Sequence, residues 1–527
     1  MSEQTVTPVP TQEFRFDPSG PLTVKSKTRL IALDTIRGFA ILGILMLNIV
    51  DFAWPNQAYD NVTQLYYSTD SVGKIPEQEK SPANDKRNDW QNLDSHKPDL
   101  KSFYPAAKVS IAAVSSTADV VEWILANILF ANKMRTLFCI MFGAGMIFLS
   151  KRSTDNGNRH IGIYYRRILI LLLFGALHGY LIWHGDILFA YAGIGLYLYP
   201  FRNYSSNTLL GISFSLFFAF ISLLWTSAGV IHHIQTHGLN LERRVRAAAP
   251  DLARLVQQSA SKDLETLEKA RSQARRSAVQ SLSAFDQLIL RAHLELSRND
   301  LAQKPEELTQ NIHKYRSASY LGIVQDRAGE IFGMQIAFIT PLSLIFIGWL
   351  MILGMSLAKS GFFAGDWPLA TYRLWAFWLV PLGWIIEAGL ISSGANSLQK
   401  NPLMSLTIWT PIHQAVIPML SLGYASALIL AIQTGYLTSI TVRLAYVGRM
   451  ALSNYLAQSV ICTFIFYSYG LGLYGRVPRL GLVPIVFGVW ILELWWSPKW
   501  LEKHAFGPVE WLWRSLTYRK LQPFRKD

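Results

Sequence analysis

Charged residues and cysteine are both scarce in this chain of 527 residues. Only 16% of the residues are charged, whereas soluble domains carry about 25%, so an ordinary soluble globular protein is excluded. The two cysteines, Cys139 and Cys462, lie far apart in apolar stretches and give neither a disulfide framework nor the ligand spacing of a zinc site. The sequence also lacks a phosphate-binding loop and a nucleophile elbow, so we predict no metal and no permanently bound cofactor.

A cleavable secretory signal is also missing from the start of the sequence. Residues 1–21 are polar and contain prolines, without the basic and apolar regions of a signal peptide. We therefore expect the first apolar segment to remain in the protein as a membrane anchor.

Long apolar segments, by contrast, fill most of the sequence. Hydrophobic residues make up 51% of the chain, and many runs are long enough to cross a bilayer core of about 30 Å. The predicted fold class is therefore all-α, a polytopic membrane protein with about ten transmembrane helices. Nine of the expected spans lie near residues 31–54, 161–183, 187–199, 209–231, 334–357, 374–391, 415–432, 450–469 and 480–495. The other span follows an amphipathic stretch over residues 120–132 and ends at residue 150.

Polar segments divide these spans into two bundles. The middle segment is charged, with apolar residues at helical spacing, and it is expected to form helices outside the bilayer. The predicted divisions are a polar N-terminus at 1–29, a first bundle at 30–231 with a polar outer segment at 55–117, the helical insertion at 232–333, a second bundle at 334–498 and a basic amphipathic tail at 499–527.

The formal net charge of +14 is placed mainly beside the membrane spans. This placement follows the positive-inside rule and argues against nucleic acid as a partner. An even number of spans with both termini in the cytoplasm fits the distribution, although Arg476 and Arg479 fall on the opposite side. We expect a multi-pass protein of a bacterial inner membrane, surrounded by the lipid bilayer. The turn at 184–186 and the insertion then lie at the outer face.

Two histidines and a carboxylate stand where two apolar segments meet. His178 falls inside an apolar segment, and His184 and Asp186 follow in the short turn at its end. Ionisable groups at membrane depth are costly and therefore indicate a functional site, and imidazole exchanges protons near neutral pH. Two structural roles stay open. His178 could satisfy a carbonyl on another helix, and Asp186 could cap the next helix after Gly185.

Further polar residues occupy other spans. Asp34 and Arg37 are three residues apart on one helix face, where they form either an ion pair or part of a ligand site. Arg135 and its neighbour Lys133 either anchor lipid headgroups or serve the function. Asn454, on a polar helix face, is a candidate for substrate binding or for hydrogen bonding between helices.

The ordered set of these motifs resembles the YeiB-like membrane family, which is described as a domain of unknown function. The resemblance covers most of the chain, but not residues 56–115 or the middle insertion. The segments that carry it are Arg29 to Gly38, Met134 to Phe138 with Phe142 to Gly145, Arg166-Arg167, Gly175 to His178, Gly185 to Leu188, Tyr315 to Tyr320, Gly448 to Tyr455 and Gly507 to Arg514.

This family is in turn similar to transmembrane acyltransferases, including the lysosomal glucosaminide N-acetyltransferase. The resemblance implies transfer of an acyl group from a cytosolic acyl-CoA, used as co-substrate, to an acceptor at the outer face. The acceptor would be a sugar, a lipid or another small molecule. By the same resemblance, His178 corresponds to the active-site histidine, and Asp34, Arg37 and Arg135 correspond to polar positions near the substrate path.

Acyl transfer needs a base that removes the acceptor's proton, and the imidazole of His178 suits this task. Asp186 or His184 could orient the ring, and Arg135 or a helix N-terminus could stabilise the oxyanion. The residues expected to attract the phosphates of coenzyme A are Arg166 and Arg167, in a basic loop.

Two other functions stay open. Gly-interrupted helices and polar groups at membrane depth would also serve a small-molecule transporter or exporter, although the two halves show no persuasive internal repeat. A non-catalytic assembly partner could use the outer polar segments to hold another protein. Association into a homo-oligomer is compatible with each of these functions.

Overall fold

The structure is a computed structural model that describes residues 24–55, 117–151, 157–248, 264–299, 305–393 and 405–526. Within these ranges the chain folds into helices and short connections, without a strand. The predicted all-α class is therefore confirmed. Residues 1–23 and nearly all of the polar segment at 55–117 lie outside the described ranges.

Seven segments of the described residues are helical, long and apolar enough to cross a membrane. They confirm the polytopic membrane class. The segments are Ile31–Ala53 in α1 (Val24–Ala53), Thr117–Phe148 in α3 (Thr117–Leu129) and α4 (Lys133–Lys151), Ile161–Leu181 in α5 (Gly157–Leu181), all of α7 (Ser206–Ala248), Leu369–Ser392 in α14 (Leu369–Leu374) and α15 (Val380–Ser392), Ser405–Thr434 with α17 (Thr410–Thr434), and α20 (Arg479–Lys503).

Three of the ten expected spans have a different form. The segment expected at 334–357 is broken between α12 (Tyr320–Ile339) and the helix Leu344–Lys359, which includes α13 (Trp349–Lys359). The two helices are bent by 71° relative to each other, and if they are counted as one span they form an eighth candidate span. The helices α6 (Leu188–Leu198) and α19 (Ala451–Phe466) have 11 and 16 residues. They reach only about 16 and 24 Å, less than a bilayer core of about 30 Å.

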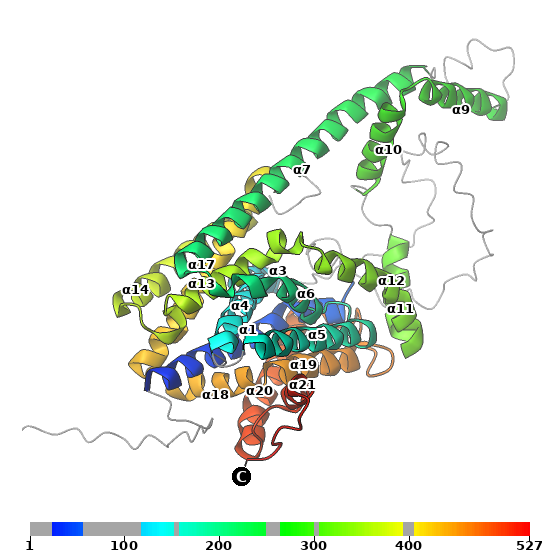
Figure 1. The fold of residues 1–527 in the computed structure, drawn as a ribbon. Helices are drawn as coiled ribbons and strands as arrows, with labels where there is room; N and C mark the ends of the chain where they lie inside the picture. Colours follow the sequence, from blue (N-terminus) through cyan, green and yellow to red (C-terminus); the bar gives the residue numbers. More distant parts are fainter. Residues whose placement is uncertain are drawn as a thin grey trace, which may run out of the picture.

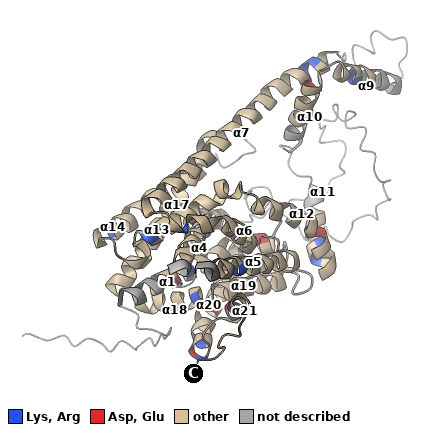
Figure 2. Ribbon diagram, viewed as in Figure 1, with Lys and Arg blue, Asp and Glu red and all other residues tan. Residues whose placement is uncertain are grey.

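The charged middle of the sequence continues from a membrane span. Helix α7 runs without a break from its apolar half to Ala248, and α9 (Leu264–Gln280), α10 (Ala284–Asn299) and α11 (Pro305–Ser317) follow. Figure 1 shows α7 rising away from the bundle with α9 and α10 at its far end. Charged residues gather there, at α11 and near the C-terminus, whereas most of the bundle is uncharged (Figure 2).

Helix α1 lies inside the bundle and contacts α4, α18 (Thr438–Arg449), α19 and α20. It crosses α18 at Gly38 and Gly448, where a Cβ on either glycine would overlap the backbone of the other helix. Small residues at such crossings allow the close packing that holds helices together in lipid. The crossing fixes the position of α1, which carries Asp34 near one end and Asp51 near the other.

Candidate functional site

The turn between α5 and α6 brings two of the predicted residues together. His178, in the last turn of α5, places Nδ1 2.9 Å from Oδ1 of Asp186. Both side chains are buried, with exposed fractions of 1% and 5%. The two helices can approach this closely because Gly175 lies against the backbone of Phe189, where a Cβ would not fit.

Asp186 also caps the helix that follows it. Its second carboxylate oxygen, Oδ2, accepts a hydrogen bond from the backbone N–H of Phe189 at 2.7 Å. The sequence left open whether Asp186 caps α6 or pairs with a histidine, and the structure shows that it does both. Because the cap holds the carboxylate, the orientation of the His178 ring follows from the start of α6.

Tyr455 of α19 completes this cluster, and sequence reasoning missed it. The backbone N–H of Ile187 donates to its hydroxyl at 3.3 Å, and the hydroxyl donates to the carbonyl oxygen of Gly185 at 3.4 Å. The ring centroids of Tyr455 and His178 are 5.1 Å apart. The available signal was the position of this tyrosine directly after Asn454, in a polar motif of an apolar helix.

The second ring nitrogen of His178 is available for chemistry. Nε2 is buried and has no hydrogen-bond partner among the described residues. Because an ionised carboxylate only accepts, the contact with Asp186 assigns the proton of a neutral imidazole to Nδ1. Nε2 then carries a lone pair in a buried site, which is the arrangement of a general base oriented by a carboxylate.

His184 contacts a different carboxylate from His178. Its Nε2 lies 3.2 Å from Oδ2 of Asp51 in α1. The preceding Trp183 stacks on Phe52, with ring centroids 4.1 Å apart. His184 therefore attaches the turn to α1 and does not orient the His178 ring.

Arg327 of α12 binds the backbone carbonyls at the C-terminal end of α5, and sequence reasoning missed this residue too. Its Nε and Nη1 donate to the carbonyls of Tyr180 and Ile182 at 3.2 and 2.9 Å. The last carbonyls of a helix lack partners within the helix, so a buried guanidinium satisfies them and complements the helix dipole. Arg327 was not predicted because it falls in the segment 232–333, which was expected to lie outside the bilayer.

The pKa of His184 is raised above its usual value of 6.5. Burial is the largest influence and acts to lower the pKa, but the charge and the hydrogen bond of Asp51 act to raise it and outweigh burial. Glu330 adds to the raising effect and Arg327 opposes it. The stability that this pair contributes is therefore fully present below the unfolded-state pKa and is lost as the pH rises through the raised pKa.

We expect Asp51→Asn to lower the thermal unfolding midpoint of the protein in detergent at about pH 6 and to have a much smaller effect at about pH 9. Each unit of pKa shift corresponds to about 1.4 kcal/mol of stability. His184→Gln should show the same pH dependence, and the double variant should lose little more than either single variant, because all three remove one pair. A loss of stability that is equal at both pH values would contradict this assignment.

Arg135 belongs to a separate cluster from His178. Its Nη2 donates to Oδ1 of Asn132 at 2.6 Å. The hydroxyl of Tyr191 in α6 donates to the carbonyl oxygen of Arg135 at 3.1 Å, so α6 connects the two clusters. The guanidinium that was expected to stabilise an oxyanion thus lies with Asn132 and not with the His178 imidazole.

Asp34 and Arg37 lie at the opposite end of the bundle from His184. They form an ion pair at 2.9 Å, with about a quarter of each side chain exposed. Asp51, the partner of His184, is 17 residues further along α1 than Asp34, a distance of about 26 Å at 1.5 Å per residue. The structure therefore supports the ion pair and separates it from the His178 cluster.

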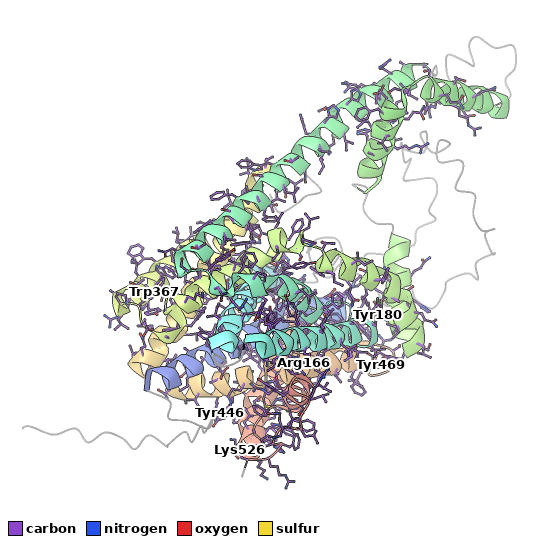
Figure 3. The ribbon with its side chains drawn as sticks, in the orientation of Figure 1. Arg166, Tyr180, Trp367, Tyr446, Tyr469 and Lys526 are labelled. Atoms are coloured by element: carbon purple, nitrogen blue, oxygen red, sulfur yellow. The ribbon has the colours of Figure 1, made fainter. Side chains whose placement is uncertain are left out.

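Arg166 and Arg167 also lie away from His178, toward the start of α5. Figure 3 shows Arg166 and Tyr180 toward opposite ends of this helix. The guanidinium of Arg167 stacks over the ring of Trp513 in α21 (Pro508–Tyr518), 3.9 Å from the ring centroid. This end of the bundle is therefore basic and carries an aromatic surface.

The amide of Asn454 is buried and engaged by other helices. Its Nδ2 donates to the carbonyl oxygen of Val447 and to Oγ of Ser497, each at 3.1 Å. Its Oδ1 accepts from Nε1 of Trp496 at 2.8 Å. These contacts join α18, α19 and α20 and form the interhelical hydrogen bonds that the sequence suggested.

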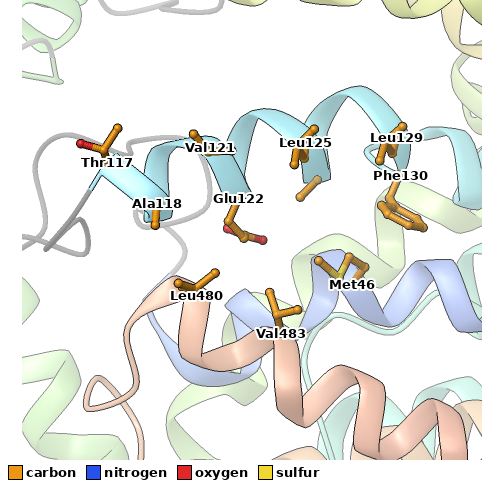
Figure 4. A pocket seen from close by; sticks show the side chains of 11 residues that line it. Met46, Thr117, Ala118, Val121, Glu122, Leu125, Leu129, Phe130, Leu480 and Val483 are labelled. Atoms are coloured by element: carbon orange, nitrogen blue, oxygen red, sulfur yellow. The ribbon is translucent and has the colours of Figure 1, made fainter.

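An apolar groove of about 600 Å³ runs between α3, α1 and α20 (Figure 4). This volume falls in the range of about 300–1,000 Å³ that is usual for small-molecule sites. Glu122 points into the groove, and its Oε2 lies 3.6 Å from Nη1 of Arg479. None of the predicted site residues lines this groove.

Comparison with known proteins relates nearly the whole chain to two bacterial proteins. It is 28% identical over 501 residues to the Uncharacterized protein YxaH of Bacillus subtilis (strain 168), covering 94% of this chain and 96% of the relative. It is 28% identical over 497 residues to the Uncharacterized protein YeiB of Escherichia coli (strain K12), covering 94% of this chain and 98% of the relative. No solved structure matches the chain.

A family match covers the C-terminal part of the chain. Residues 357–520 match the family described as Protein of unknown function (DUF418). These comparisons confirm the resemblance to the YeiB-like membrane proteins that the motifs indicated, and the DUF418 match lies at residues 357–520.

Proposed function

We propose that this protein is a membrane acyltransferase, which moves an acyl group from a cytosolic acyl-CoA to a hydroxyl or amine acceptor at the outer face. The observation that carries the proposal is the buried pair of His178 and Asp186, with Nε2 of His178 free of any partner among the described residues. Ionisable groups inside a membrane bundle are costly to keep unless they serve a function. The resemblance of the family to transmembrane acyltransferases supports the same activity.

The proposed reaction uses His178 first as a base and then as an acid. Nε2 removes the proton of the acceptor O–H or N–H as that atom attacks the thioester carbonyl carbon. A C–O or C–N bond forms, the C–S bond breaks, and the sulfur leaves as the coenzyme A thiolate, which takes the proton from Nε2. The carboxylate of Asp186 stabilises the imidazolium between the two transfers. Catalysis of this kind contributes about 10²–10⁴-fold.

The donor would bind at the opposite end of the bundle from His178. Arg37, Arg166 and Arg167 lie there, and guanidinium groups bind phosphates through paired hydrogen bonds. Arg167 precedes His178 by 11 residues on α5, which corresponds to about 16 Å along the helix. The pantetheine arm of the acyl-CoA, with the acyl group at its end, would therefore extend along the bundle from the basic end to the His178 end.

We further propose that both termini face the cytoplasm of a bacterial cell and that the protein lies in its inner membrane. The connection between α4 and α5 is rich in Lys and Arg over residues 151–167, and the turn that follows His178 has neither. This asymmetry favours an outer position for His178. The relatives named above are both bacterial, which supports the same location.

Titration with thioesters tests the donor. We expect acetyl-CoA or a longer acyl-CoA to raise the thermal unfolding midpoint of the purified protein in a saturable way, equivalent to about 2.7 kcal/mol at 100 times the Kd. Replacing Arg166 and Arg167 together by Gln should move the titration to higher ligand concentrations. Arg243→Gln, at an exposed position of α7, serves as the control and should leave the titration unchanged. If none of the thioesters shifts the unfolding midpoint, the proposal of an acyl-CoA donor is contradicted.

Transport of a small solute is the second candidate, because the span that α12 and α13 form is sharply bent. Helix α12 and the helix Leu344–Lys359 bend by 71° at a short interruption. Interrupted helices at membrane depth form the substrate sites of many transporters. Uptake of a solute into proteoliposomes under a proton gradient, without consumption of a thioester, would favour this function.

A further inference from the structure

A break in a membrane span carries a second polar cluster. The span Thr117–Phe148 is interrupted where α3 ends at Leu129 and α4 begins at Lys133. Within the break, Asn132 has a backbone φ of 59°, in the left-handed region that asparagine enters more readily than most residues. Its side chain reaches His413 in α17, so the break is tied to a neighbouring span.

Contacts between polar atoms connect five side chains, here called the Arg135 cluster: Asn132, Lys133, Arg135, Glu387 and His413. Arg135 donates to Oδ1 of Asn132 at 2.6 Å, and Nδ2 of Asn132 lies 3.3 Å from Nε2 of His413. Nδ1 of His413 lies 3.0 Å from Oε1 of Glu387. Nζ of Lys133 lies 3.5 Å from the same carboxylate oxygen. Three spans, in α4, α15 and α17, therefore meet at this cluster.

The charges of the Arg135 cluster do not cancel. Lys133 and Glu387 form a buried ion pair, with exposed side-chain fractions of 0% and 3%. Nδ2 of Asn132 can only donate, so Nε2 of His413 accepts its hydrogen bond and this imidazole is neutral. Arg135 is therefore a positive charge in excess. Among the residues that the structure describes, no carboxylate lies within ion-pair distance of its guanidinium.

The guanidinium of Arg135 is placed to accept a ligand. The residue is exposed, whereas Lys133 and Glu387 are buried. A guanidinium has five N–H donors, and the hydrogen bond to Asn132 uses one of them. An unbalanced charge within a membrane span is costly, and the planar fork of arginine matches a pair of oxygens on a phosphate or a carboxylate.

We propose that Arg135 binds the anionic group, a phosphate or a carboxylate, of a ligand that enters the bundle at the His178 end. The start of α4 and the end of α5 lie at the same end of the bundle, because both contact the first turn of α6, at Tyr191 and at Phe189. Tyr191 contacts the backbone of Arg135 from α6, the helix that Asp186 caps. The site is defined by binding alone, so it does not depend on acyl transfer.

Arg135→Gln tests the site, because glutamine removes the charge and keeps a polar side chain. For soluble anions, the thermal unfolding midpoint of the full-length protein in detergent is measured against inorganic phosphate, with chloride keeping the ionic strength constant. For lipid phosphates, nanodiscs of phosphatidylglycerol are compared with nanodiscs of phosphatidylcholine. We expect the wild-type protein to be stabilised in at least one series. Arg135→Gln should weaken the apparent affinity about 10-fold or more, as expected for loss of a charge-assisted hydrogen bond.

Two further variants separate binding from folding. Arg373→Gln replaces another exposed arginine of a membrane span and should respond as the wild type does. Asn132→Gly keeps the left-handed backbone and removes the amide between Arg135 and His413, so it should weaken the response less than Arg135→Gln. A response confined to phosphate assigns a soluble ligand, and one confined to phosphatidylglycerol assigns a lipid headgroup. A wild-type response in Arg135→Gln, or no response of the wild type in either series, would overturn the proposal.

Discussion

His178→Gln is expected to lower acyl transfer by about 10²–10⁴-fold, the range that general base catalysis contributes. The imidazole is buried and Nδ1 lies 2.9 Å from Asp186, so the replacement must also satisfy that carboxylate. A glutamine amide can donate to it, but it has no nitrogen that takes up a proton near neutral pH. The variant should therefore fold and bind a donor while losing transfer. The measurement is incorporation of label from radioactive acetyl-CoA into the lipid and sugar fractions of a membrane extract.

The neighbouring residues sharpen this test. Asp186→Asn keeps an oxygen for the cap on Phe189 but no longer stabilises the imidazolium, so its transfer rate should fall and its pH–rate profile should move. His233→Gln, at an exposed position of α7, should transfer at the wild-type rate. Thermal unfolding midpoints of the three variants show whether a loss of rate reflects loss of the fold. Full transfer activity in a folded His178→Gln protein would exclude the proposed role.

The long membrane spans could be predicted from the sequence because hydropathy over a long window responds mainly to burial in lipid. Helices α1, α5 and α20 are such segments and fall close to the expected positions, whereas α7 begins near the expected residue but continues to Ala248 instead of ending at residue 231. The same signal also predicts that α6 and α19 are membrane spans, although both helices are too short to cross a bilayer. The apolar character of α6 reflects burial inside the protein, where nearly all of its residues are inaccessible, and not exposure to lipid. Hydropathy does not distinguish these two apolar surroundings, and only the helix length does.

The candidate site shows a similar division between local and distant contacts. The pairing of His178 with Asp186 could be anticipated because the two residues are only eight apart across a short turn. The contacts of Tyr455 and Arg327 with this turn join segments separated by more than a hundred residues, and hydropathy carries no information about such pairings. Glu387 was missed for another reason, since a single carboxylate barely lowers the mean hydropathy of its span.

Lys133→Met is expected to destabilise the protein by about 3–5 kcal/mol, the cost of leaving one partner of a buried ion pair without the other. The ammonium is fully buried, 3.5 Å from Glu387, and donates at 2.7 Å to the carbonyl oxygen of Asn127. Without it, the carboxylate of Glu387 keeps, among the residues that the structure describes, only the contact with His413 inside a membrane span. The measurement is the free energy of unfolding in detergent. Lys499→Met, at an exposed position of α20, should change it little.

The double variant Lys133→Met, Glu387→Leu measures how far the contributions of Lys133 and Glu387 to the stability of the protein depend on each other. Two well-packed apolar residues avoid the desolvation of both charges, so the double variant should recover much of the stability that Lys133→Met loses. Its Asn132 contact with His413 would remain, and the break between α3 and α4 would lose its buried charges but not its shape. If the double variant is instead as unstable as the sum of the two single variants, the two side chains act independently. The Arg135 cluster would then be a set of separate contacts and not one connected network.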